Sequence, residues 1–330
     1  MGRRLGRHLE WTYADAMSDR FEEAEVMRDR FEEHAALVAL IRGLGKGTKW
    51  SSVTERVLDS GSACRVWEGQ ESETLLPDPA RNALLSGARR DLEVWAAKGW
   101  RFLGVLDDEY PSRIREIHQA PPFLFAAGSV KADDPAIAVV GSRKASSRGL
   151  DISASVARAL VDRGITVLSG LAEGIDGAAH RAALQLGGRT VAVIGTGLAR
   201  SYPAANKILQ REVSDAGLVL SQFWPDGPPQ SHNFLMRNAV MSGYGRATLV
   251  VEAGEQSGAR AQARLAVEHG RAVILTDQVA QGNEWAKRLI GRPSVYVASG
   301  VDELMGYVDQ VLKVEDTVFD LLGDLVGSAQ

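Results

Sequence analysis

From about residue 136 onward, short apolar runs alternate with longer amphipathic stretches. Short runs that end in glycine or polar residues are typical of buried strands, and apolar residues at three- and four-residue steps are typical of helices. The pattern predicts strands at about 136–141, 165–169, 189–194, 217–221, 247–252, 271–275 and 294–298. It predicts helices at about 147–163, 175–187, 203–215, 233–243, 258–269, 283–290 and 301–313. This alternation predicts an α/β fold in which a parallel sheet carries helices on both faces.

The first hundred residues follow a different pattern. Residues 13–42 predict a charged helix, and Trp50–Leu58 predicts a second helix after a glycine-rich turn. The apolar positions of the first helix are Phe21, Met27, Phe31, Ala35 and Val38. Two helices about such a turn either contact a nucleic-acid backbone through the turn amides or form a plain packing module, which is the more common case.

Residues 61–90 are polar and irregular, and they include Pro77 and Pro79, so we expect a loop or linker there. A short helix at 91–100 and a strand at 101–106 follow. We therefore expect a small helical N-terminal domain with its linker at 1–90, the sheet domain at 91–313 and a short C-terminal tail at 314–330.

The composition indicates a soluble globular protein, because 45% of the 330 residues are hydrophobic and 24% are charged. No apolar run approaches the roughly 20 residues that span a membrane, and the basic start at residues 1–7 has no apolar core after it. We therefore expect a cytoplasmic protein without a membrane partner. Cys64 is the only cysteine, which excludes intrachain disulfides and zinc sites built from several cysteines. The net charge of −4 still allows a local basic groove for nucleic acid.

Three glycine-bearing turns each follow a predicted strand. They are Gly141-Ser142-Arg143, the segment Gly170–Asp176 that contains Gly174, and Gly195-Thr196-Gly197. A strand that ends in glycine before a helix places backbone N–H groups where a phosphate can approach. Because the carboxyl ends of parallel strands meet at one edge, the three turns predict a single anion-binding crevice.

Cations and further turns extend this predicted crevice. Arg143 would hold a phosphate by charge as well as by hydrogen bonds, whereas Lys144 and Arg148 fit a solvated loop better. Arg237-Asn238 enters a later helix at the same edge, and Ser257-Gly258 opens another helix with free amides and a hydroxyl.

Several neighbouring residues have two interpretations. Asp176 and His180 form either a catalytic or metal-binding pair or, as we favour, a helix cap and a packed histidine; no third metal ligand is apparent. Glu252 either acts as a base or holds Arg237. Tyr202 either walls the crevice or stacks on a base, and Trp224 is either a packing anchor or a base platform.

The order and spacing of these motifs resemble one known family over about residues 100–305. The segments that carry the resemblance are Tyr110-Pro111, Pro121–Phe125, Gly141–Arg143, Gly174–Asp176 with Ala179-His180, Gly195–Gly197 with Tyr202-Pro203 and Asn206, Arg237-Asn238, Val251–Ala253 and Ser257-Gly258. Together they are similar to the DNA-processing protein A (DprA/Smf) family. The turn and helix at Gly43–Leu58 resemble the small N-terminal helical domain of that family.

The resemblance implies a Rossmann-like domain that binds single-stranded DNA, dimerises, protects incoming strands and helps to load the RecA recombinase. It implies no catalysis and no cofactor. The phosphate-binding positions that it implies are Gly141, Ser142, Arg143, Gly174, Arg237, Asn238 and Ser257. To these the glycine turns add Gly195, Gly197 and Gly258 as candidates for contact with DNA phosphates.

Three positions depart from the family's pattern and suggest a diverged member. Ala199 stands where the family usually has aspartate, and Gln222 stands where it favours glutamate. Ala239 replaces a second arginine, which we expect to remove one cation from the groove.

Two other classes of function remain open. One is a nucleotide sensor or a phosphoribohydrolase-like enzyme of the same superfamily, although the turn Glu252–Gly258 lacks the Pro-Gly-Gly-x-Gly-Thr signature of those enzymes. The other is a partner-binding protein in a defence system, for which the charged helix at 13–42 offers a contact surface.

Overall fold

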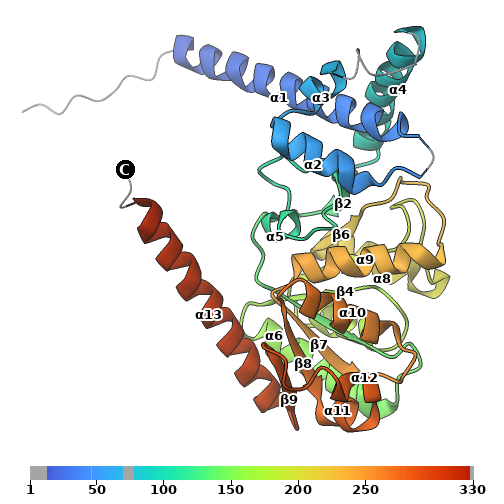
Figure 1. Ribbon diagram of the computed structural model, residues 1–330, viewed down its shortest axis with the longest axis vertical. Coiled ribbons are helices and arrows are strands. Elements are labelled where there is room, and N and C mark those ends of the chain that lie inside the picture. Colours follow the sequence, from blue (N-terminus) through green and yellow to red (C-terminus); the bar gives the residue numbers. More distant parts are fainter. Residues whose placement is uncertain (1–12, 46, 70–77, 328–330) are drawn as a thin grey trace, which may run out of the picture.

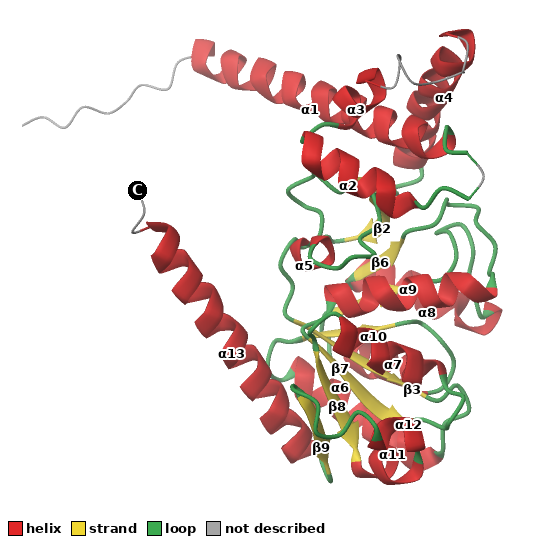
Figure 2. Ribbon diagram, viewed as in Figure 1, coloured by secondary structure: helices red, strands yellow, loops and turns green. Residues whose placement is uncertain are grey.

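The computed structural model describes residues 13–45, 47–69 and 78–327 (Figure 1). The basic start at residues 1–7 and Pro77, on which two of our expectations rest, lie outside the described residues. Figure 2 shows the N-terminal helices gathered at one end of the molecule, next to the layer of strands.

Within the described residues the chain forms one sheet of nine strands, in the order β1-β2-β6-β5-β4-β3-β7-β8-β9. The strands are β1 (Arg101–Gly104), β2 (Phe123–Gly128), β3 (Ala136–Gly141), β4 (Thr166–Ser169), β5 (Thr190–Val193), β6 (Leu218–Ser221), β7 (Ala247–Glu252), β8 (Ala272–Thr276) and β9 (Val295–Ala298). From β6 to β9 all neighbours are parallel, which confirms the predicted Rossmann-like α/β fold.

The helices that follow the strands cover both faces of the sheet. They are α6 (Ser147–Val161), α7 (Ile175–Gln185), α8 (Lys207–Ala216), α9 (Ser231–Tyr244), α10 (Gly258–Glu268), α11 (Asp277–Gly282), α12 (Glu284–Lys287) and α13 (Val301–Gly327). Alternate residues of one strand face opposite layers, as the pleat requires. In β3, Ile137 and Val139 pack with α6, α7 and α13, whereas Ala138 and Val140 belong to the core on the other face.

The sheet is wider than the purely parallel one that we predicted. Strand β2 pairs antiparallel with β6, and β1 pairs antiparallel with β2. Both added strands are almost wholly buried, so they lack the alternation that reveals a half-exposed antiparallel strand in a sequence. The predicted strand at 101–106 is thus β1, and the segment before residue 136 adds two strands to the sheet.

The N-terminal region consists of α1 (Tyr13–Arg42), α2 (Trp50–Ser60), α3 (Ala63–Gly69) and α4 (Asp78–Ala97). The expected linker at 61–90 is wrong, because α3 and most of α4 lie in it. Pro79 occupies the first turn of α4, where proline is tolerated because its missing N–H has no helical partner. From there Ala88, Leu92 and Trp95 recur at helical spacing and are buried.

An aromatic cluster joins this helical region to the sheet. The ring of Trp224 lies 4.8 Å from that of Phe123, 5.9 Å from that of Trp95 and 5.9 Å from that of Trp50. Phe102 and Phe125 complete the cluster. Aromatic rings bury large apolar areas, so this contact makes the helices and the sheet one continuous core.

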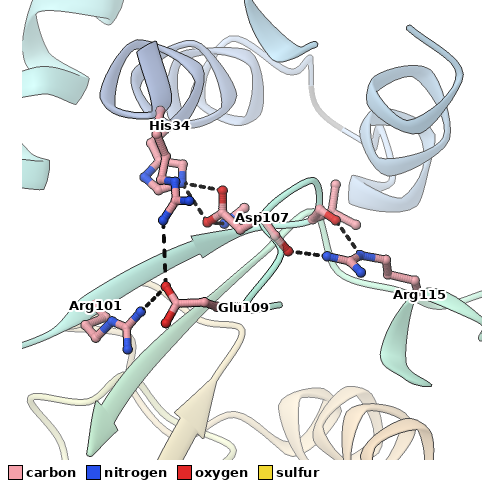
Figure 3. A network of polar contacts seen from close by, with 8 residues as sticks. His34, Arg101, Asp107, Glu109 and Arg115 are labelled. Atoms are coloured by element: carbon pink, nitrogen blue, oxygen red, sulfur yellow. Dashed lines mark hydrogen bonds and ion pairs between the residues drawn. The ribbon is translucent and has the colours of Figure 1, made fainter. Parts of the chain in front are cut away.

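Polar contacts beside this core connect α1 to the turn after β1 (Figure 3). His34 Nε2 lies 2.8 Å from Asp107 Oδ2, and that carboxylate also accepts a hydrogen bond from Gly104 N at 2.9 Å. Arg115 donates to the carbonyls of Val105 and Asp107. The largely buried Asp107 carboxylate therefore joins a helix, a strand end and a turn.

The segment predicted as a C-terminal tail is instead the continuation of a helix. Helix α13 runs through the expected boundary at residue 313 and ends at Gly327, and Figure 1 shows it leaving the sheet at β9. No glycine or proline occurs between Gly306 and Gly323, so nothing in the sequence stops the helix there.

We predict that Asp107→Ala lowers the free energy of unfolding by about 1–3 kcal/mol, because it leaves Gly104 N and His34 without their shared acceptor. Urea denaturation measures the change. Asp108→Ala is the matched control, because the Asp108 side chain is exposed at the neighbouring position. We expect it to change the free energy of unfolding by no more than about 0.5 kcal/mol. If Asp107→Ala changes the free energy of unfolding as little as Asp108→Ala does, the network contributes nothing measurable to stability.

Candidate functional site

A cleft of about 570 Å³ opens at the carboxyl ends of the central strands. Strand β3 lies between β4 and β7, so the chain first builds the sheet outward in one direction and then returns to build it in the other. Such a topological switch point leaves a crevice in open α/β sheets. The cleft is lined by Val140–Lys144, Ala172, Asp176, Phe234, Arg237, Asn238, Met241, Gly254, Gln256–Ala259 and Gln262.

The first glycine turn lies in the cleft wall, as predicted. Gly141 is required by close packing, since an added Cβ would lie 2.5 Å from a side-chain carbon of Ile175. The N–H of Ser142 is not free, however, because it donates to the carbonyl of Glu252 at 2.7 Å. Arg143 is exposed at the rim of the cleft, with its guanidinium 5.4 Å from the ring centre of Phe234. The side chain of Arg143 is thus the most available cationic group of this turn.

The second turn packs against the first. Gly174 has φ +75, and an added Cβ would lie 2.2 Å from the carbonyl oxygen of Ser142. Only glycine adopts this conformation at such a close approach without strain. The Asp176 carboxylate accepts hydrogen bonds from the amides of Gly170 and Ala172. Gly174 therefore shapes the cleft, while a carboxylate of the protein already occupies two amides of its turn.

The third turn does not join the crevice, contrary to our prediction. Gly195 and Gly197 are buried and are absent from the cleft lining. The N–H of Gly197 donates to the carbonyl of Gly227, and an added Cβ would lie 2.0 Å from the carbonyl oxygen of Trp224. Gly195 leaves room for the ring of Phe234. The requirement for glycine at both positions comes from backbone and ring packing, which the sequence does not distinguish from an anion site.

Arg237 forms the floor of the cleft and is only 6% exposed. Its Nη1 donates to the carbonyls of Gly170 and Val193, and its Nε donates to Asn238 Oδ1 at 3.0 Å. Burial lowers the pKa of Arg237, and the nearby Asp176 carboxylate opposes that shift. Burial likewise raises the pKa of Asp176, against the effect of the Arg237 charge. Arg237 and Asn238 line the cleft as predicted, but Arg237 also ties two strand ends together.

The two proposed catalytic groups have structural partners. His180 is fully buried, and its Nδ1 lies 2.7 Å from Thr190 Oγ1, away from Asp176. Because the Thr190 hydroxyl donates to Val167 O, His180 must donate from Nδ1. Glu252 neither holds Arg237 nor stands free, since it accepts hydrogen bonds from the backbone and hydroxyl of Ser146 at the start of α6. The favoured packing interpretation of His180 agrees with these contacts.

Phe234 is a cleft residue that we did not single out from the sequence. Its half-buried ring lies between Arg143 and Tyr202, whose ring centre is 5.4 Å away. A smaller cavity of about 310 Å³ adjoins the cleft here and shares Arg143, Ala172, Phe234 and Arg237 with it. Tyr202 lines this cavity and is 43% exposed. The position of Phe234 three residues before Arg237, on the same side of α9, was the available signal.

The start of α10 closes the cleft opposite Arg143. Ser257 is the N-cap, and its hydroxyl accepts a hydrogen bond from Ala259 N at 3.2 Å. Gly258, the first residue of the helix, also lines the cleft. The positive end of the helix dipole therefore points toward the space between the two walls. Both Ser257 and Gly258 lie where the sequence predicted them.

The three departures from the family's pattern lie outside this cleft. Ala239 is buried with Ile117, Ala120 and Leu265, so an alanine there does not remove a cation from the cleft as we expected. Gln222 is buried, and Ala199 lies beyond the third turn. Trp224 is a packing anchor of the aromatic cluster.

Comparison with known proteins agrees with this geometry. A family model described as DNA recombination-mediator protein A matches residues 101–305. This chain belongs to that family. The DNA processing protein DprA of Streptococcus pneumoniae is 41% identical over 203 residues, which cover 61% of this chain and 72% of the relative. Protein Smf of Escherichia coli is 38% identical over 196 residues, covering 58% and 52%.

Solved structures of the DNA recombination-mediator protein A family share the fold. The crystal structure of DprA from Streptococcus pneumoniae superposes with a TM-score of 0.62 at 31% identity, covering 84% of this chain and 96% of that one. The DNA processing protein A of Helicobacter pylori superposes with a TM-score of 0.57 at 22% identity, covering 65% and 96%.

The described residues contain no group of three or more histidine, cysteine, aspartate or glutamate side chains that could hold a metal ion. Nor does any helix among them combine the length and the apolar character that crossing a bilayer requires.

We predict that the stability of the protein falls as the pH drops below about 6.5, in part because of His180. Burial, with Arg181 and Arg237 nearby, lowers the pKa of His180 from its usual value of 6.5 to about 3. The unfolded chain therefore binds a proton in this window while the folded chain does not, at a cost of about 1.4 kcal/mol per pH unit.

Urea denaturation between pH 7 and pH 5 measures this slope. His180→Asn keeps a donor for Thr190 but does not titrate, so its slope should be shallower by the contribution of one histidine. His269, whose pKa burial lowers to about 4, contributes separately and is unchanged in this variant. Identical slopes in the two proteins would contradict the prediction.

Proposed function

We propose that this protein is a non-enzymatic recombination mediator that binds single-stranded DNA in the cleft at the switch point. The observation that carries the proposal is the exposed Arg143 guanidinium, which lies against the Phe234 ring at the rim of that cleft. A cation and an aromatic face side by side match the two repeating parts of a single strand, phosphate and base.

The charge of the lining supports an anionic ligand. Arg143, Lys144 and Arg237 contribute three cationic side chains, whereas Asp176 is the carboxylate among the lining residues. Asp176 is already bound to two loop amides and lies beside Arg237. We infer that a phosphate binds between Arg143 and the start of α10, where Ser257 and Gly258 present a helix N-terminus.

The adjoining smaller cavity suits a base. Tyr202 and Phe234 lie side by side there, and Tyr202 is partly exposed. Stacking of a base on an aromatic ring is tolerant of sequence because every base has a π-face. We infer that successive nucleotides of one strand occupy the cleft and this cavity, with little reading of base identity.

The interactions of Glu252 favour binding over catalysis. The carboxylate that the sequence offered as a base is held by Ser146 at a helix start. The structure from Helicobacter pylori concerns the single-stranded DNA binding mode of that relative, whose fold this chain shares. We extend the proposal to loading of a RecA-type recombinase, in DNA uptake or recombination, by a homodimer in the cytoplasm.

We predict that Arg143→Ala weakens binding to a short single-stranded oligonucleotide by roughly tenfold at moderate salt. It should also reduce the slope of log affinity against log salt by about 0.7, the value for one phosphate contact on a single strand. Fluorescence anisotropy at two or more salt concentrations measures both quantities, with double-stranded DNA and mononucleotides as competitors.

Lys131→Gln is the matched control, since Lys131 is an exposed cation before β3, at the opposite edge of the sheet. It should leave affinity and slope unchanged. If Arg143→Ala behaves like this control, the cleft does not bind the phosphate backbone. Release of a free base from nucleoside monophosphates would instead favour the hydrolase alternative.

A second substitution tests the aromatic wall. We predict that Phe234→Ala weakens binding by the loss of one stacked base, about 1–3 kcal/mol or 5- to 150-fold, with the salt slope unchanged. Phe234→Tyr keeps the ring and should retain most of the affinity. An equal loss in both variants would show that Phe234 acts through packing against Gly195 and not through DNA.

A further inference from the structure

Another polar and aromatic cavity, of about 430 Å³, lies where the N-terminal helices meet the sheet. Its walls include Arg42 at the end of α1, Trp95 and Asp91 on α4, Lys98 and Trp100 in the turn that follows, and Trp224. We call it the N-terminal cavity. It shares no lining residue with the cleft or with the cavity beside Tyr202.

The N-terminal cavity nevertheless borders the cleft system through one short segment. Ala199 lines the N-terminal cavity, and Ser201 and Tyr202 line the cavity beside Phe234. Two residues of chain span at most about 7 Å, so the openings are neighbours along the carboxyl edge of the sheet. Arg200, exposed between them, adds a cation to the path.

The chemistry of this cavity fits a nucleobase better than a phosphate. Arg42 and Asp91 form an ion pair at 2.6 Å, and Lys98 is accompanied by Asp226, so the lining charges nearly cancel. The Arg42 guanidinium lies 5.2 Å from the ring centre of Trp224, and Lys98 Nζ lies 5.1 Å from that of Trp100. Both indoles are only partly buried and line the cavity. Indole rings and guanidinium planes are surfaces on which bases stack.

We propose that a single strand bound in the cleft continues past Ser201 and Arg200 and places a base in the N-terminal cavity, against Trp100 and Trp224. This inference rests on the proposed function and adds a second contact to it, supplied by the helical region. Because the lining is nearly neutral, the contact contributes stacking and little counterion release.

The test is a titration of the full chain with oligothymidylates of increasing length, from roughly 4 to 16 nucleotides, the range of common single-strand sites. The affinity for short oligomers should reflect binding in the cleft alone. Once the strand reaches the N-terminal cavity, affinity should rise by roughly tenfold, which corresponds to one stacked base. Trp100→Ala should abolish this gain and leave the affinity for short oligomers unchanged, and Trp100→Phe should restore it.

Lys98→Glu is a second variant, because its exposed side chain is not part of the core. It should reduce the gain even if Trp100→Ala lowers the Tm. Lys131→Gln, at the opposite edge of the sheet, should keep the gain. If the gain persists in both Trp100→Ala and Lys98→Glu, the inference is overturned while binding in the cleft stands. If short oligomers bind no more weakly to Arg143→Ala than to the unmodified chain, the proposed function itself fails.

Discussion

A single buried guanidinium determines the shape of the cleft. Arg237 binds the carbonyl ends of two neighbouring strands, at Gly170 and Val193, and so holds β4, β5 and α9 together at one point. A buried charge is costly unless its hydrogen bonds are satisfied, and the Asp176 carboxylate and the strand carbonyls offset that cost. Gly170 is part of the same arrangement, because an added Cβ would lie 2.0 Å from the guanidinium. Phe234, one helical turn earlier, is thereby placed at the rim.

Glycine has a different role in this site from the one that its sequence pattern suggests. Each turn lacks a Cβ because another part of the backbone or a ring approaches it closely, as Ser142 approaches Gly174. The N–H groups of these turns mostly donate to other groups of the protein. The groups left to contact a ligand are therefore side chains and the start of α10. A crevice built in this way presents Arg143 and an aromatic wall on a rigid frame, which suits a repeating polymer better than one small cofactor.

Helices and strands were predictable wherever the apolar residues recurred with a regular helical or strand spacing. The strands and helices from β3 to α10 lie within a few residues of their predicted positions, and Ser146 and Ser257 cap helices where a hydroxyl precedes an amphipathic run. Prediction failed where one residue type fits two structures. A proline such as Pro79 occurs both in loops and at helix starts. A glycine such as Gly197 occurs both at anion sites and where two backbone segments approach closely. The contact of Arg237 with two strand ends depends on strand order, which no local pattern contains.

The two antiparallel strands at the sheet edge have a mechanical consequence. Since β1 pairs with β2 and β2 pairs with β6, and the rings of Phe123 and Phe125 lie in the same cluster as Trp95 and Trp224, the helical region packs directly against the sheet. Separating the helical region from the sheet would expose this aromatic core to water. The N-terminal helices and the parallel sheet thus share one core, which holds surfaces on the two at a fixed spacing and lowers the entropy cost of ordering them on binding.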